Sequence, residues 1–131
     1  MSDWLVPAHA FVTLAMLTTV LHMQFLHYPL FSGLDPKRFH EWHGFHTRRI
    51  TWIVLPLMGF ELIASFLMVD ALLLALTLGI FAVTGLWSAR MHTRLARDGL
   101  AAGTLRSLLW SNLVRLVAYV AKFGVLCTIL F

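Results

Sequence analysis

Histidine is the residue type in this chain whose placement points most directly to chemistry. The sequence contains seven histidines, and most of them lie close to the ends of apolar segments. Neutral imidazole nitrogens bind transition-metal ions and haem iron, so histidines brought together by several helix ends form a candidate ligand set. We predict a haem- or metal-binding site whose cofactor-binding residues are His22, His27, His43, His46, His92 and Arg115. The metal ligands among them would be His22, His43, His46 and His92.

The run His40-x-x-His43-x-x-His46 is the densest part of this histidine group. Residues three apart drift by about 60° around a regular helix, so these three side chains do not easily face one ion. Taken singly, each histidine fits an ordinary side chain at the membrane surface better than a ligand, and only the cluster as a whole points to a metal or haem. The spacings differ from the histidine boxes of membrane di-iron desaturases. The sequence also lacks a phosphate loop, a dinucleotide turn, a CxxC pair and a nucleophile elbow.

Two charged residues, Glu61 and Lys122, interrupt long apolar segments. Each lies about nine residues before the outer end of its segment, which places both at a depth of roughly 13 Å. A lone charge at such a depth costs about 2.5–3.5 kcal/mol or more. Because the depths match and the charges are opposite, we predict that the two residues form a buried ion pair. The pair would either fix how two helices dock or serve as a proton or ligand site, and His9 is near enough in depth to join it.

The last apolar segment carries further polar side chains at helical spacing. Intervals of three, four and three residues place them on one helix face, and that face must point into a bundle because lipid would not tolerate it. These residues are Asn112, Arg115, Tyr119 and Lys122. His43 and Glu61 are separated by about five full turns and share a stripe provided that the second helix already begins near His43, and Pro56 would kink that stripe.

The elements that must position these side chains are four apolar segments. They cover about residues 4–28, 47–69, 71–89 and 107–131, and each is long enough to cross about 30 Å of hydrocarbon. Residues 50–89 are too long for one span, and Asp70 near their centre marks a tight hairpin. We therefore predict an all-α polytopic membrane protein, a four-transmembrane-helix bundle that forms a single domain over residues 1–131.

Composition supports a membrane protein and argues against a soluble one. The chain is 60% hydrophobic and 12% charged, with a mean hydropathy of +0.81, whereas soluble domains carry about 25% charged residues. The net charge of +4 does not indicate nucleic acid, because the basic residues flank apolar segments. The expected partners are the lipid bilayer and either further copies of the chain or a larger membrane assembly.

The basic residues also predict the orientation of the chain. Nine lysines and arginines fall at span ends on one face, and the opposite face has only Asp3 and Asp70. Positive residues stay on the cytoplasmic side, so both long loops should be cytoplasmic and both termini outside. The basic residues counted are Lys37, Arg38, Arg48, Arg49, Arg90, Arg94, Arg97, Arg106 and Arg115.

Several motifs occur along the chain: His27-Tyr28-Pro29-Leu30-Phe31, Phe39, residues 43–50, Pro56, Met58, Glu61-Leu62, Asn112, Arg115, Tyr119 and Lys122. Together they resemble a group of small, uncharacterised bacterial four-helix membrane proteins over most of the chain. The layout is also weakly similar to the bacterial membrane protoporphyrinogen oxidase family in its aromatic-Pro-x-Phe exit from span one, its basic start and proline in span two, and the Asn opening the last span. That similarity implies a haem association. It does not carry over the activity, because the histidine of that family's first span has no clear counterpart here.

These observations favour a redox-active, haem- or metal-binding protein of the bacterial inner membrane, and such a protein could be an oxidoreductase. Its histidine cluster would lie at the cytoplasmic boundary. The alternatives are a small channel or transporter that uses the Glu61–Lys122 polar core, or a structural subunit of a membrane complex.

Overall fold

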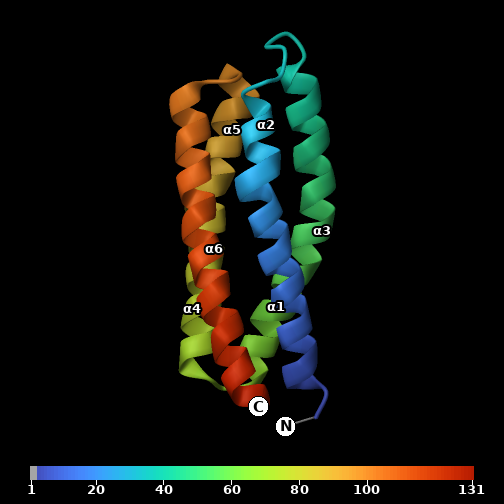
Figure 1. Ribbon diagram of the computed structural model, residues 1–131, viewed down its shortest axis with the longest axis vertical. Coiled ribbons are helices and arrows are strands. Elements are labelled where there is room, and N and C mark those ends of the chain that lie inside the picture. The colour runs from blue at the N-terminus through green and yellow to red at the C-terminus, as the bar shows by residue number, and fades with distance from the viewer. Residues whose placement is uncertain (1–2) are drawn as a thin grey trace.

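The computed structural model describes residues 3–131, and this part of the chain is all α-helical, with no strand. Four long helical rods run alternately up and down (Figure 1). Each rod is long and apolar enough to cross a membrane. The rods are α1 Leu5–His22 continued by η1 Met23–His27 and α2 Tyr28–Phe31; α3 Phe39–Leu67; α4 Ala71–Ala82 continued by η2 Val83–Ser88 and α5 Ala89–Asp98; and α6 Ala102–Leu130.

The fold class and the four predicted helices are confirmed, but the helices are longer than the predicted spans. The second helix begins at Phe39, the third continues to Asp98, and the fourth begins at Ala102. The extra turns carry charged side chains, which hydropathy excludes from a span. Backbone hydrogen bonding continues through them regardless, because helix formation does not depend on an apolar environment.

The predicted hairpin at Asp70 is present between α3 and α4. Val69 adopts a left-handed backbone conformation with φ of 54°, which ends α3. Asp70 then caps α4 by accepting a 2.9 Å hydrogen bond from the backbone N–H of Leu73. Asp is a favoured N-cap residue because its carboxylate satisfies a free amide of the first turn.

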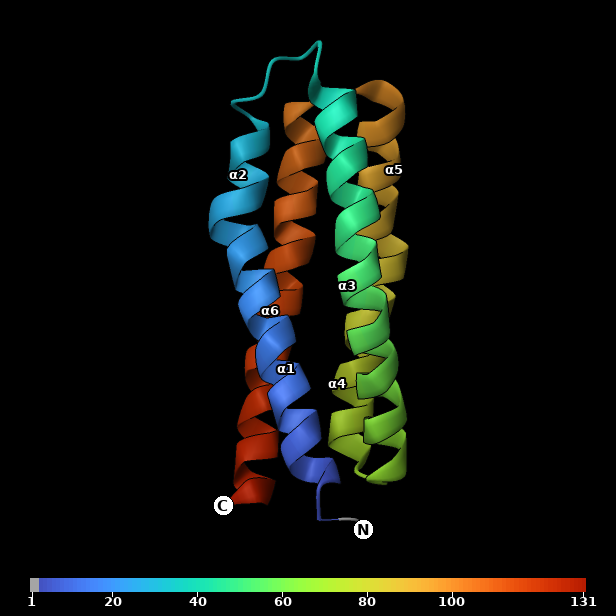
Figure 2. The ribbon, with the colours of Figure 1, turned by 90° about the vertical axis from the view of Figure 1, so that its right-hand side faces the viewer.

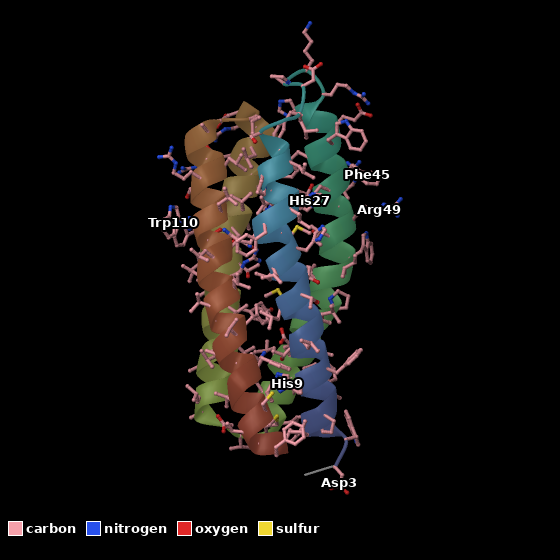
Figure 3. The ribbon with its side chains drawn as sticks, viewed as in Figure 1. Asp3, His9, His27, Phe45, Arg49 and Trp110 are labelled. Atoms are coloured by element: carbon pink, nitrogen blue, oxygen red, sulfur yellow. The ribbon has the colours of Figure 1, made fainter. Side chains whose placement is uncertain are left out.

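The two ends of the bundle differ. Asp3, the α3–α4 turn and Phe131 lie at one end, which we call the terminal end (Figures 1 and 3). The α2–α3 loop and the α5–α6 turn lie at the other, the loop end. Large apolar side chains cover the outer surface and suit contact with lipid; Trp52, for example, is 81% exposed.

Packing of the core divides into three layers along the bundle axis. Figure 2 shows α3 at the side of the bundle opposite α6, with α1 and the α4–α5 rod as the other two sides. The loop-end layer contains Phe31 and Phe39, the middle layer Met16 and Met58, and the terminal layer Leu73 and Leu126. Polar side chains lie inside the bundle between and beside these layers.

Candidate functional site

Four histidines come together inside the loop end of the bundle. His27 lies on η1, His43 and His46 lie on α3, and His92 lies on α5. Figure 3 shows His27 near this end and His9 near the other. Three separate rods thus supply the imidazoles, which we call the histidine cluster.

The closest contact in the histidine cluster joins α3 to α5. His43 Nε2 lies 3.0 Å from His92 Nδ1. The other ring nitrogen of His92, Nε2, lies 3.2 Å from the hydroxyl oxygen of Tyr28. Tyr28 therefore holds the His92 ring in place from the first rod.

A second contact joins the first rod to α3. The rings of His27 and His46 stack with their centroids 4.2 Å apart. The Nε2 atoms of both histidines are buried and have no hydrogen-bond partner. A buried nitrogen without a partner costs free energy, so these two atoms are available for a ligand. Phe31 packs edge-on against both His46 and His43.

Two of the histidines considered in the sequence lie outside this arrangement. His22 is exposed, and its ring centroid is 6.3 Å from that of His27. His40 is exposed as well, beside Gly99 at the end of α5. Within residues 3–131, no group of three or more His, Cys, Asp or Glu side chains is arranged to hold a metal ion.

A second polar centre lies deeper, toward the terminal end, and contains the predicted pair. Lys122 Nζ donates a 2.9 Å hydrogen bond to Glu61 Oε1. Thr13 Oγ1 also donates to Oε1, at 2.7 Å, and the Tyr119 hydroxyl donates to Oε2 at 3.0 Å. Lys122 is 0% exposed and Glu61 is 1% exposed. The carboxylate is thus held by three donors from two other helices, as a buried charge requires.

His9 does not bond to Glu61, although the matching depth suggested it. Its Nδ1 lies 3.3 Å from the sulfur of Met68, and its Nε2 is buried without a partner. Thr13 occupies the place beside the carboxylate instead, one turn along from His9 on α1.

Arg115 lies elsewhere than the basic-residue count assumed. It is 7% exposed and sits in the middle of α6, not at a span end. Its Nη2 donates a 2.7 Å hydrogen bond to Asn112 Oδ1, and Nη1 is 3.4 Å from Thr84 Oγ1. Asn112 in turn donates to the backbone carbonyl of Val20 and to the side chain of Gln24. Arg115 therefore belongs to a separate polar centre between the other two.

A cavity of about 290 Å³ lies beside this arginine. Polar side chains from all four rods face it, and apolar side chains, mostly from α1 and α3, complete its wall. Thr51 and Leu55 on α3 are among the lining residues and are exposed. The polar lining comprises Thr19, Tyr28, Thr47, Thr51, Thr84, Ser88, His92 and Arg115.

Sequence reasoning missed three residues that complete these centres: Tyr28, Thr13 and Gln24. Tyr28 was visible only as part of a motif, since nothing in its spacing points to His92. Thr13 and Gln24 are ordinary polar residues in an apolar segment. Their positions opposite Glu61 and Asn112 depend on how the first rod is rotated about its axis relative to its neighbours. The sequence pattern of one helix gives the depth of a residue in the membrane but not this rotation. Comparison with known protein families, with curated proteins and with solved structures found no match for this chain.

Proposed function

We propose that this protein is a membrane-embedded metal-binding protein that holds a redox-active transition-metal ion at the histidine cluster. The observation that carries the proposal is the gathering of four imidazoles from three rods, two of them with unpartnered buried nitrogens. Imidazole is a suitable ligand for copper, iron, nickel and zinc. Bound there, such an ion would supply one-electron chemistry next to the membrane surface.

One pair of imidazoles in the cluster, His43 and His92, is close enough to share an ion. Two nitrogens 3.0 Å apart, as in His43 and His92, can both lie about 2.1 Å from one ion at a near-right angle. His46 is the nearest further imidazole, with its ring centroid 5.9 Å from that of His92. The Tyr28 hydroxyl on the far nitrogen of His92 acts as the outer partner that a metal-bound histidine usually has.

A haem fits the same residues less well. The His27 and His46 rings stack directly on each other, which leaves no space between them for a porphyrin. The neighbouring cavity, at about 290 Å³, is at the lower end of the roughly 300–1,000 Å³ typical of small-molecule pockets. The cluster therefore supports an ion in preference to a haem.

The test is metal analysis of protein purified in a non-ionic detergent with an affinity tag that contains no histidine. We expect about one copper or iron ion per chain, and its loss in His43→Ala and in His92→Ala. His40→Ala, at an exposed position, and His9→Ala, at the terminal end, are the matched controls and should keep the metal. Equal metal content in all five proteins would refute the site, and so would metal-free wild-type protein after growth with added copper and iron. A Soret band in the visible spectrum would show that the protein binds haem and not a bare metal ion.

For the setting, we infer the bacterial inner membrane with both termini outside. The loop-end half of the bundle carries eight Lys and Arg side chains after Arg115 is removed from the count, while the terminal end offers Asp3 and Asp70. Positive residues favour the cytoplasmic side. The histidine cluster would then lie on the cytoplasmic side of the bilayer.

A second candidate is a small channel or transporter, or a structural subunit of a complex, built on the Glu61–Lys122 core. The polar centres at Glu61, at Arg115 and at the histidine cluster follow one another along the axis, which favours a path for protons. Against a path, both Glu61 and Lys122 are sealed from solvent. Proton flux into liposomes that contain the protein, measured with a pH-sensitive dye, would support this candidate if it disappeared in Glu61→Gln.

A further inference from the structure

Among residues 3–131, Arg115 is the one charged side chain buried inside the bundle that has no opposite charge beside it. The ion pairs in residues 3–131 join Arg38 to Glu41, Arg97 to Asp98 and Lys122 to Glu61. Arg115 has only neutral partners, and its Nε is buried with no partner at all. A guanidinium cannot lose its proton in a protein, so this charge remains uncompensated inside the bundle.

An uncompensated buried cation is costly. A central arginine costs about 2.5–3.5 kcal/mol on insertion scales, and more on others. Glu61 cannot supply the missing charge because it is committed to Lys122, Tyr119 and Thr13. Side chains such as Arg115, when they occur inside membrane proteins, mark the path or the site of a ligand.

The cavity beside Arg115 has the lining of a site for a molecule with two chemically different parts. Arg115, Thr84, Ser88 and His92 form a polar wall on α6, η2 and α5. Met16, Val54 and Met58 form an apolar wall on α1 and α3, and exposed Leu55 connects the cavity to the outer surface of α3. A polar head can thus lie inside while an apolar tail leaves toward the lipid.

Both π-helical segments of the molecule are placed at this cavity. Met23 at the start of η1, and Thr84 and Ser88 in η2, line it. A π-turn inserts an extra residue into a helix and rotates the side chains that follow it, and such turns are frequent at functional sites. Here η2 directs Thr84 toward the guanidinium and Ser88 toward the cavity.

We propose that the cavity binds a single-chain amphiphile through its carboxylate, which pairs with Arg115. A carboxylate is planar, carries one negative charge and accepts parallel hydrogen bonds from a guanidinium. Thr84 and Ser88 line the same wall, but their hydroxyls already donate to the Ile80 carbonyl and to Ser111 Oγ, so the guanidinium of Arg115 is the main donor to the carboxylate. A cavity of about 290 Å³ admits such a head with the first part of its chain, whereas the phosphate, glycerol and second chain of a phospholipid need more room. This site is separate from the metal site, although His92 borders both.

The test is equilibrium binding of radiolabelled palmitate to delipidated, EDTA-treated protein in dodecylmaltoside. EDTA removes any metal, so the result does not depend on the histidine site. We expect saturable binding of about one palmitate per chain to the wild type, and at least tenfold weaker binding to Arg115→Gln. Arg106→Gln removes an exposed arginine from the same helix and should bind like the wild type. Arg115→Lys keeps the charge without the paired donors, so we expect an intermediate affinity.

A second variant keeps the proposal testable if Arg115→Gln does not fold. Thr51→Trp places a large ring at the exposed edge of the cavity and leaves Arg115 intact, and it should also abolish saturable binding. Acetate should compete only at far higher concentration, because it lacks the chain. Equal binding to wild type and Arg115→Gln would overturn the proposal, as would acetate competing as well as unlabelled palmitate. Displacement of palmitate by an equimolar acidic phospholipid would overturn it too.

Discussion

Arg115 and Lys122 lie about two turns apart on α6, and both side chains point into the bundle, yet only the lysine meets a carboxylate. Lys122 Nζ is 2.9 Å from Glu61 Oε1, whereas Arg115 is hydrogen-bonded to the neutral side chain of Asn112. The two cations therefore differ in their effect on the charge balance inside the bundle. The lysine is neutralised within the fold, and the arginine leaves a positive charge that the fold itself does not balance.

The first prediction concerns the buried ion pair. Glu61→Gln alone, or Lys122→Met alone, leaves one charge buried without its partner, and each should lower the free energy of unfolding by about 3–5 kcal/mol. The double variant leaves no orphan charge, so its loss should be clearly smaller than the sum. Thermal unfolding in detergent, followed by circular dichroism, measures the cycle. Losses that simply add would show that the two residues do not interact in the folded protein.

The second prediction separates a supporting hydrogen bond from the ion pair. Tyr119→Phe removes the hydroxyl that donates to Glu61 Oε2 and keeps the ring in the middle core layer. The carboxylate retains two donors, so the loss should be about 1–3 kcal/mol, less than for Lys122→Met. The same thermal measurement applies. A Tyr119→Phe protein that is as unstable as Lys122→Met would mean that the hydroxyl, not the ammonium, is the main partner.

The third prediction concerns the orienting contact of the histidine cluster. Tyr28→Phe deletes the hydroxyl beside His92 Nε2 while the aromatic packing stays. If His92 binds a metal ion, loss of this outer partner should weaken metal affinity about 10–100-fold without abolishing it. Competition titration with a chromogenic chelator gives the affinity. Unchanged affinity in Tyr28→Phe, together with metal loss in His92→Ala, would show that Tyr28 does not orient the ligand.

The fourth prediction concerns orientation. An alkaline phosphatase fusion at the C-terminus, which is active only outside the cytoplasm, should be active, and a fluorescent protein that folds only inside should remain dark there. A fusion in the α2–α3 loop near Lys37 should give the reverse pattern. The physical reason is the basic charge of the loop end. An inactive phosphatase at the C-terminus would mean that the orientation is the reverse of the one proposed, with the histidine cluster on the outer side.

The fifth prediction concerns the packing of the α3–α4 hairpin. The hydroxyls of Ser65 and Thr77 are 2.8 Å apart and buried. Thr77→Val keeps the shape but leaves Ser65 without this partner, and it should cost roughly 0.6–2 kcal/mol. Thr128→Val is the matched control, because Thr128 is exposed and bonds only to the backbone of its own helix. Equal stability of the two variants would show that the buried hydroxyl pair does not stabilise the hairpin.

What the sequence allowed us to predict follows from what a single helix encodes. Hydropathy and length identify four helices, and Asp70 marks the hairpin, because these properties belong to each segment alone. The Glu61–Lys122 contact was predictable as well, since depth in a bilayer is fixed by residue counting and two opposite charges at one depth have a strong reason to meet.

The rest depends on helix rotation, which no single segment specifies. His22 and His27 are close in sequence, but only His27 turns inward, and the π-turn between α1 and α2 contributes to that difference. Arg115 was counted with the basic residues at span ends, whereas the structure places it in the middle of α6. The cavity beside Arg115 is lined by side chains from all four rods, so no pattern within a single segment predicts it.

The shortness of the α3–α4 turn has a consequence for how the chain enters the membrane. Only residues 68–70 separate the two helices, and Asp70 is the one charge in that turn. With so short a connection, we expect the two helices to enter the bilayer together as one hairpin, with the hydroxyls of Ser65 and Thr77 able to bond to each other on the way. In the orientation proposed above, this step moves a single carboxylate, that of Asp70, across the lipid.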